Sequence, residues 1–188
     1  MLPQSSSIKE AEWWAKYGAI SGLVATWAIS TAIAASEIEL GLVIGTFYAV
    51  IGMSLGIGDF ASAAYAGFGL HLLTGALLGA MMGLAVSRFV RNGMRNPYRA
   101  VLAGMCAGVA VWLVLFLPLT VLVVQPSLAG TGALLAGSFT QGTGQLVLGI
   151  GLSAIAFHLV WGAIFGYMSS AFLRIKAFRT SRLEGHAK

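Results

Sequence analysis

The sequence predicts an all-α integral membrane protein with four main transmembrane helices in two tandem repeats, each with a Gly-rich interfacial or re-entrant helical segment between its spans. Composition is the first reason: 58% of the 188 residues are hydrophobic and 9% are charged, whereas about a quarter of the residues in a soluble domain are charged. Mean hydropathy is +0.87. The second reason is an internal repeat, and the third is the confinement of basic residues to the flanks of long apolar runs. A net charge of +5 placed on such flanks argues against nucleic acid as a partner.

The internal repeat is seen in a nine-residue pattern that occurs twice. His71 opens HLLTGALLG, and His158 opens HLVWGAIFG 87 positions later. Two further matches lie in the same order at offsets of 86 and 85: Gly18 and Gly22 with Gly104 and Gly108, and Gly45, Thr46 and Gly52 with Gly130, Thr131 and Gly137. Ordered matches at one spacing favour a duplication. We therefore predict a first repeat at 16–95 and a second at 96–173.

The apolar runs give the elements in order. After an interfacial lead at 1–15, we predict spans at about 17–35, 61–87, 100–124 and 146–173, and then a basic cytoplasmic tail at 174–188. Each span is close to or above the roughly 20 residues that cross a hydrocarbon core. Small residues at 31–35 resemble a signal-peptide cleavage site, but we expect the first run to be retained as a span. Pro118 predicts a kink in the third span.

Between the spans of each half lies a segment that we predict to be interfacial or re-entrant. Residues 38–58 contain five glycines, and residues 127–144 are rich in Gly, Ser and Thr. Glycine weakens helices. Three acidic residues fall in or beside the first of these segments, and we expect them to be solvated surface carboxylates: Glu37, Glu39 and Asp59.

The basic residues predict the topology. No Lys or Arg lies between Tyr17 and Ser87 or between Ala100 and Leu173, whereas clusters of them follow each half. Because basic loops stay on the cytoplasmic side, each half crosses an even number of times, and both termini of this multi-pass protein of the cell membrane are cytoplasmic. The alternative is an inverted repeat with three crossings in each half.

Small residues recur about every fourth position in the spans, which lets helix backbones approach closely. We predict that these seams pack helices inside the chain, with contacts to a partner subunit as the alternative. The packing residues are Gly18, Gly22, Gly67, Gly75, Gly79, Gly83, Gly104, Gly108, Gly162, Gly166 and Ser170.

His71 and His158 lie in these seams, so both should point into the bundle. We expect each neutral imidazole to hydrogen-bond a hydroxyl or a backbone carbonyl of a neighbouring helix. An ionisable residue inside a membrane is also a functional candidate. One alternative is cofactor binding, in which the two histidines are the axial ligands of a haem b and the nearby glycines leave room for the porphyrin. A metal or proton role is another, although no Cys, Asp or Glu in the same spans supplies a further metal ligand.

Two segments carry a resemblance to a known group of proteins. The stretch GTFYAVIG at 45–52, together with HLVWG at 158–162, resembles small multi-span membrane proteins of ammonia-oxidising archaea. Some of these look like accessory subunits of the membrane copper ammonia monooxygenase complex. The resemblance implies a helper subunit that packs beside catalytic subunits and supplies neither copper ligands nor catalytic residues.

The sequence contains no arrangement typical of an enzyme, such as a Ser/His/Asp set, a phosphate-binding glycine loop or paired membrane carboxylates. We therefore predict a non-catalytic accessory or structural subunit of a larger integral membrane complex, a copper membrane monooxygenase being one candidate. Its partners would be other integral membrane subunits and the lipid bilayer. Two alternatives stay open: a homo-oligomeric pore or carrier for small solutes, lined by His71 and His158, and a b-type haem protein.

Overall fold

The computed structural model describes residues 4–39, 41–89, 93–124, 126 and 143–186, and all regular structure in these ranges is helical. Within the described chain, four helices are long and apolar enough to cross a membrane: Ile8–Glu39, Phe60–Ser87, Pro97–Leu122 and Ser153–Arg179. The prediction of an all-helical protein with four such spans is confirmed to that extent. Residues 127–142 of the predicted second Gly-rich segment lie outside the described residues.

The first and last helices are longer than the apolar runs predict. Helix α1 covers Gln4–Glu39, so most of the predicted lead belongs to the same helix as the first span. Helix α7 covers Thr143–His186 and includes nearly all of the predicted tail. Charged residues such as Lys9 and Glu10 are good helix formers, so a helix need not end where its apolar run ends.

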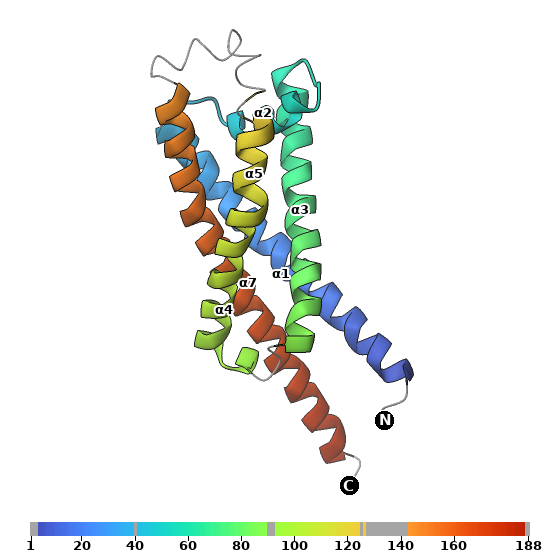
Figure 1. Ribbon diagram of the computed structural model, residues 1–188. Helices are drawn as coiled ribbons and strands as arrows, with labels where there is room; N and C mark the ends of the chain where they lie inside the picture. Colours follow the sequence, from blue (N-terminus) through green and yellow to red (C-terminus); the bar gives the residue numbers. More distant parts are fainter. Residues whose placement is uncertain (1–3, 40, 90–92, 125, 127–142, 187–188) are drawn as a thin grey trace.

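The four long helices form two pairs, which meet where α1 crosses α7 at a shallow angle (Figure 1). Helix α1 packs along α3 (Phe60–Phe89), and α4 (Pro97–Val111) packs along α7. Contacts between α1 and α7 join the two pairs. The centre of this crossing is a buried cluster of Ala25, Ile29, Trp161 and Phe165, in which the Trp161 and Phe165 rings stack with centroids 5.6 Å apart.

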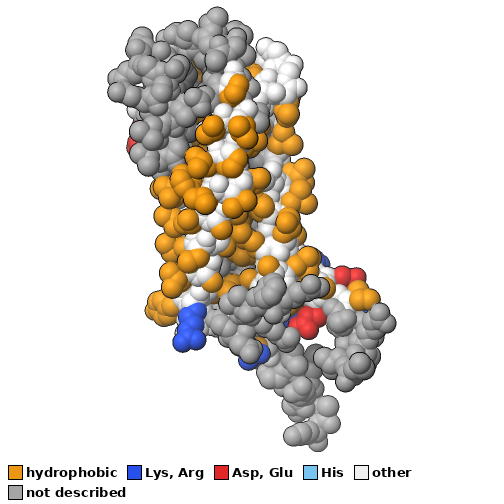
Figure 2. Space-filling view, in the orientation of Figure 1, with side chains coloured by type: hydrophobic (Ala, Val, Ile, Leu, Met, Phe, Trp, Pro, Cys, Tyr) orange, Lys and Arg blue, Asp and Glu red, His pale blue; other side chains and the backbone are white. Residues whose placement is uncertain are grey.

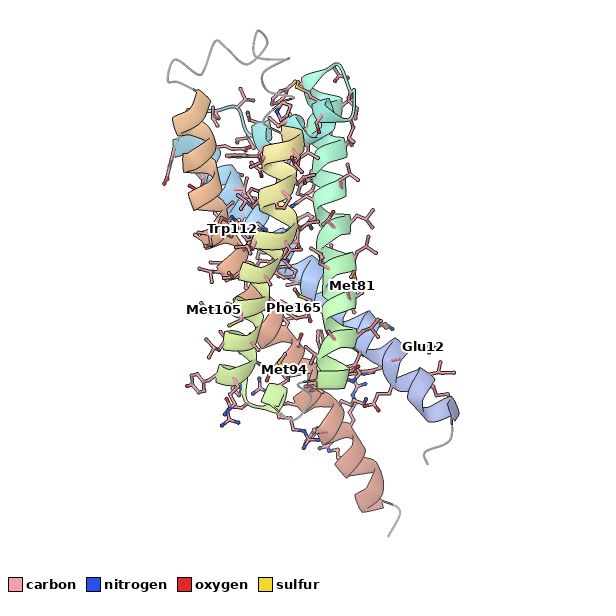
Figure 3. The ribbon with its side chains drawn as sticks, viewed as in Figure 1. Glu12, Met81, Met94, Met105, Trp112 and Phe165 are labelled. Atoms are coloured by element: carbon pink, nitrogen blue, oxygen red, sulfur yellow. The ribbon has the colours of Figure 1, made fainter. Side chains whose placement is uncertain are left out.

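Both chain ends and the turn between the two pairs lie at one end of the bundle (Figure 1). The turn is the 3₁₀ helix η1 (Gly93–Arg95), which contacts α7. Its Met94, labelled in Figure 3, is buried in a second cluster with Trp14, Ala100 and Leu173. The ammonium group of Lys176 lies 4.3 Å from the ring centroid of Trp13, so this end is held together by aromatic and cation–π contacts.

The third span begins with a cap and contains two irregular turns. The Asn96 side-chain oxygen accepts hydrogen bonds from the backbone N–H groups of Tyr98 and Arg99, and Pro97 occupies the first turn, where its missing N–H costs nothing. Pro118 lies in the short α5 (Leu117–Leu119), between the π-helical turns η2 (Trp112–Phe116) and η3 (Thr120–Val124). Such π-turns adjust the backbone hydrogen bonding that a proline interrupts.

A short helix lies at the opposite end of the bundle from the chain termini (Figure 1). Helix α2 (Thr46–Ser54) has nine residues, less than half of what a span requires. It packs on α3, where a Cβ added to Gly52 would overlap the backbone of Ala63, and one added to Gly67 would overlap that of Tyr48. On the face shown in Figure 2, hydrophobic side chains cover the middle of the bundle, and Lys and Arg gather at the end bearing the termini.

Candidate functional site

The predicted glycine seams lie between helices of the chain itself. A Cβ added to Gly18 would overlap the Gly79 carbonyl, and one added to Gly22 would overlap the Gly75 carbonyl, so α1 and α3 are in backbone contact. A Cβ on Gly83 would overlap the Trp14 carbonyl of α1. Within the described residues, these glycine faces are therefore filled by the chain's own helices.

The α4–α7 pair is built in the same way but in a different register. A Cβ on Gly104 would overlap the Gly162 carbonyl, and Cβ atoms on Gly108 and Gly166 would meet the backbone of His158 and Ala100. In the repeat alignment Gly104 and Gly162 correspond to Gly18 and Gly75, yet Gly18 lies against Gly79. The two contacts thus differ by one helical turn, and the tandem repeat stays a prediction.

The side chain of Thr26 in α1 forms hydrogen bonds where α1 crosses α7. Its hydroxyl donates to the carbonyl of Gly22 at 2.8 Å and accepts the indole N–H of Trp161, also at 2.8 Å. A Cβ on Gly75 would overlap this hydroxyl. Glycine at 75 therefore lets α3 approach closely enough to cover the hydrogen bond that joins α1 to α7.

His71 belongs to α3 and His158 to α7, so each helix pair contributes one histidine. The ring of His71 lies 5.4 Å from that of Tyr48, between centroids, and its Nε2 atom is buried without a hydrogen-bond partner. The ring of His158 lies 5.1 Å from that of Phe116, and its Nδ1 atom lies 2.7 Å from the carbonyl oxygen of Ala154. The partner of His158 is thus a carbonyl of its own helix and not, as expected, of a neighbouring helix, and Nε2 of His71 has no partner.

The surroundings of the two histidines do not fit a haem. A porphyrin between the imidazoles needs open space beside the neighbouring glycines, but those glycines face other parts of the bundle. Gly75 is covered by Thr26, and Gly162 by Gly104. Aromatic side chains contact both imidazole rings. Among the described residues there is also no group of three or more His, Cys, Asp or Glu side chains that could hold a metal ion.

The prediction that Glu37 is a solvated surface carboxylate is wrong. Predicted to be a solvated carboxylate, its side chain is 0% exposed, whereas Glu39 and Asp59 are exposed as expected. Its two carboxylate oxygens accept the backbone N–H groups of Gly45 and Phe47, each at 2.7 Å. These donors belong to the first turn of α2, which has positive electrostatic potential. A carboxylate from α1 therefore caps α2.

The buried Tyr48 of α2 interacts with Glu37 and with Ser30 of α1, and its burial was not expected from the sequence. Burial raises the pKa of Tyr48, a hydrogen-bonding interaction with Ser30 opposes the shift, and the nearby charge of Glu37 adds to it. The hydroxyl of Tyr48 nevertheless meets no partner with hydrogen-bond geometry. A Tyr in a Gly-rich run, at the start of a short helix, resembles an interfacial anchor, so its burial could not be read from the sequence.

Ser170, the last of the predicted packing residues, is fully buried in α7, and its hydroxyl oxygen has no hydrogen-bond partner. It lies one turn beyond Gly166, which contacts the backbone of Ala100.

No protein-family model matches the chain, and no curated protein and no solved structure matches it.

Proposed function

We propose that this chain is a non-catalytic accessory or structural subunit of a larger integral membrane complex. The observation that supports it most is the uneven covering of the four spans. The apolar windows of α1 and α7 are 39% and 33% buried, whereas those of α3 and of the span 97–122 are each 17% buried. All four windows are thus less than half buried, and α3 and the span 97–122 leave the largest share open to lipid or to helices of another protein.

Exposed hydrophobic side chains form a ridge along the uncovered surface of α3. Its exposed side chains follow one another at intervals of three, four, four and three residues, which is close to the 3.5-residue repeat of helices that pack side by side. Side chains of this kind provide the van der Waals packing by which membrane helices associate. The α3 ridge consists of Leu70, Leu73, Leu77, Met81 and Leu84.

The proposal also agrees with the small number of candidate catalytic and metal-binding groups. The described residues contain no candidate metal cluster, and the small-residue seams hold the chain's own helices together. A chain that builds a self-contained bundle and leaves more than half of each span uncovered is suited to packing beside other subunits. The resemblance of 45–52 and 158–162 to accessory proteins of ammonia-oxidising archaea makes a copper membrane monooxygenase the first complex to test.

A photo-reactive amino acid at Leu77 tests the proposal in membranes of the source organism. We expect a discrete adduct with a different integral membrane protein, identified by mass spectrometry after solubilisation in mild detergent. The control carries the same group at Tyr98, which is exposed at the basic end of the bundle, and should not give that adduct. Adducts of the Leu77 variant with lipid alone, or with a second copy of the chain, would contradict the proposal.

A second candidate function is a homo-oligomeric carrier or pore for small solutes. The observation in its favour is the presence of two buried polar atoms without partners, Tyr48 Oη and His71 Nε2. Reconstitution into liposomes tests it. A symmetric oligomer with a solute flux that His71→Leu abolishes would support this function, and liposomes as impermeable as empty ones would exclude it for the solutes tested.

We also propose that the end bearing both termini is cytoplasmic. The turn with Arg95 and Arg99 lies at this end, as does the part of α7 that carries Arg174, Lys176 and Arg179 (Figures 1 and 2). Basic residues next to membrane spans favour the cytoplasmic side. The opposite end, with α2, would then face the outside.

A further inference from the structure

Four polar side chains from four helices lie near one another. They are Ser30 of α1, Tyr48 of α2, His71 of α3 and His158 of α7. The rings of Tyr48 and His71 are in contact, with centroids 5.4 Å apart. Ser30 contributes a hydrogen-bonding interaction to the electrostatics of Tyr48, and His158 contributes to those of His71. We refer to these four residues as the polar cluster.

Two members of the polar cluster have unmet hydrogen-bonding capacity. Tyr48 is 7% exposed, and neither its hydroxyl nor Nε2 of His71 has a partner, although both atoms are shielded from solvent. A buried polar atom without a partner is destabilising, and most such atoms in native proteins bind a protein group or an ordered water. The two rings that carry these atoms are in contact, and each atom lacks a partner from the chain itself.

His158 and Ser30, the other two members of the polar cluster, supply hydrogen-bond acceptors. Nδ1 of His158 lies 2.7 Å from the Ala154 carbonyl, which can only accept, so Nδ1 carries the proton and Nε2 of the neutral ring keeps its lone pair. The Ser30 hydroxyl donates to the carbonyl of Thr26 at 2.8 Å, which leaves its oxygen lone pairs. The polar cluster thus offers a phenolic donor and at least two acceptors.

We infer that the polar cluster binds a small uncharged molecule that both donates and accepts hydrogen bonds. Ordered water and a water-sized polar solute share this chemistry. An ion fits poorly, because both oxygens of the nearest carboxylate, Glu37, already accept backbone N–H groups, and an unpaired charge inside a membrane bundle is costly. This site is independent of the accessory role proposed above, since it lies inside the chain and not on the α3 ridge.

The variant Tyr48→Phe tests the inference, because it removes the hydroxyl and keeps the ring. If the hydroxyl binds a guest molecule, the thermal midpoint of the detergent-solubilised protein should fall by about 2–4 °C. Tyr65→Phe is the matched control, because Tyr65 is 80% exposed on α3, and should leave the midpoint unchanged. An unchanged or higher midpoint for Tyr48→Phe would mean that the hydroxyl has no partner and would overturn the inference.

Solid-state NMR of ¹⁵N-histidine-labelled protein in lipid bilayers identifies the guest. His71 is assigned by comparison with His71→Gln and His158→Gln. Rapid magnetisation transfer from water to the His71 ring nitrogens is expected if the guest is water. A hydrogen-bonded Nε2 shift without such transfer, which disappears after extensive dialysis, is expected for a solute. An Nε2 shift typical of a nitrogen without a hydrogen bond, with no water transfer, would refute both.

Discussion

Gly79 lies in the contact between α1 and α3. A Cβ at this position would overlap the Gly18 carbonyl and crowd the backbone of Gly22. Backbone atoms cannot rotate out of the way as the end of a side chain can, so the helices themselves would have to separate. The seam is therefore sensitive to the addition of a single methyl group.

We predict that Gly79→Ala lowers the free energy of unfolding by about 1–3 kcal/mol, the usual cost of overfilling a packed core. Gly69→Ala is the matched control, because Gly69 lies in the same helix with no atom within 4 Å of an added Cβ. It should be neutral or slightly stabilising, since alanine favours helix. Reversible unfolding by added SDS, followed by tryptophan fluorescence, measures both. A Gly79→Ala variant as stable as Gly69→Ala would show that the contact with α1 does not constrain position 79.

Glu37 leads to a second prediction at the scale of single residues. Glu37→Ala leaves the N–H groups of Gly45 and Phe47 without their side-chain acceptor, so we expect a loss of about 1–3 kcal/mol. Glu37→Gln keeps one acceptor oxygen and should lose less. Glu39→Gln is the control, because Glu39 is exposed, and should change little in the same unfolding assay. If Glu37→Ala matched this control, the carboxylate would not hold α2 in place.

Sequence reasoning identified the glycines of the seam but not the burial of Glu37, because that burial depends on contact with another segment of the chain. Small residues at every fourth position are visible in a one-dimensional pattern, and the structure puts Gly18 and Gly79 in contact. Glu37 and Glu39 are two positions apart in the same polar stretch, so nothing in the pattern separates the buried one from the exposed one. Their difference arises from α2, which folds back so that its first turn reaches Glu37.

Among the helices, too, some features can be predicted from the sequence and others cannot. Apolar length predicts the four spans, because a hydrocarbon core imposes about 20 residues on any crossing helix. It does not predict α2, which lies within a Gly-rich segment and whose stability depends on the cap from Glu37 and on the contact of Gly52 with Ala63. Nor does it predict where α1 and α7 end, because their outer turns continue into charged sequence.

The start of α3 provides a prediction at this scale. Asp59, the one aspartate of the sequence, accepts the Ser62 backbone N–H at 2.8 Å, and this hydrogen bond lowers the pKa of its carboxyl group. A carboxyl whose pKa is lower in the folded state stabilises that state above its unfolded pKa of about 3.9 and loses the effect as pH falls through the folded value. We therefore expect acidification below about pH 4 to weaken the first turn of α3.

Selective ¹³C-aspartate labelling gives a single carboxyl signal, whose titration in bicelles measures this pKa directly. It should lie below the reference value of 3.8. In Ser62→Pro, which has no backbone N–H to donate, the pKa should return toward that value. A normal pKa in the unmodified protein would show that Asp59 does not cap α3.

At the scale of the whole molecule, two helix pairs are joined by the crossing of α1 and α7. The join consists of the apolar cluster around Phe165 and the Trp161–Thr26 hydrogen bond. The repeat pattern favours two equivalent pairs, but it cannot give their register, because glycines at every fourth position allow contacts shifted by one turn at little cost. The observed shift between the Gly18–Gly79 and Gly104–Gly162 contacts is such a case. The arrangement of the pairs is therefore a property of the packed molecule and not of either half.

Orientation in the membrane is the prediction that belongs to the whole molecule. If both termini and the turn at η1 are cytoplasmic, a cysteine at Gly93 should be protected from a membrane-impermeant maleimide in intact cells and labelled after lysis. A cysteine at Gly58, where nothing lies within 4 Å of an added Cβ, should be labelled in intact cells. Both variants need a Cys106→Ser background, because Cys106 is exposed. Labelling at position 93 from outside would place the central arginines on the outer face, against the charge rule, and would require an odd number of crossings in each half.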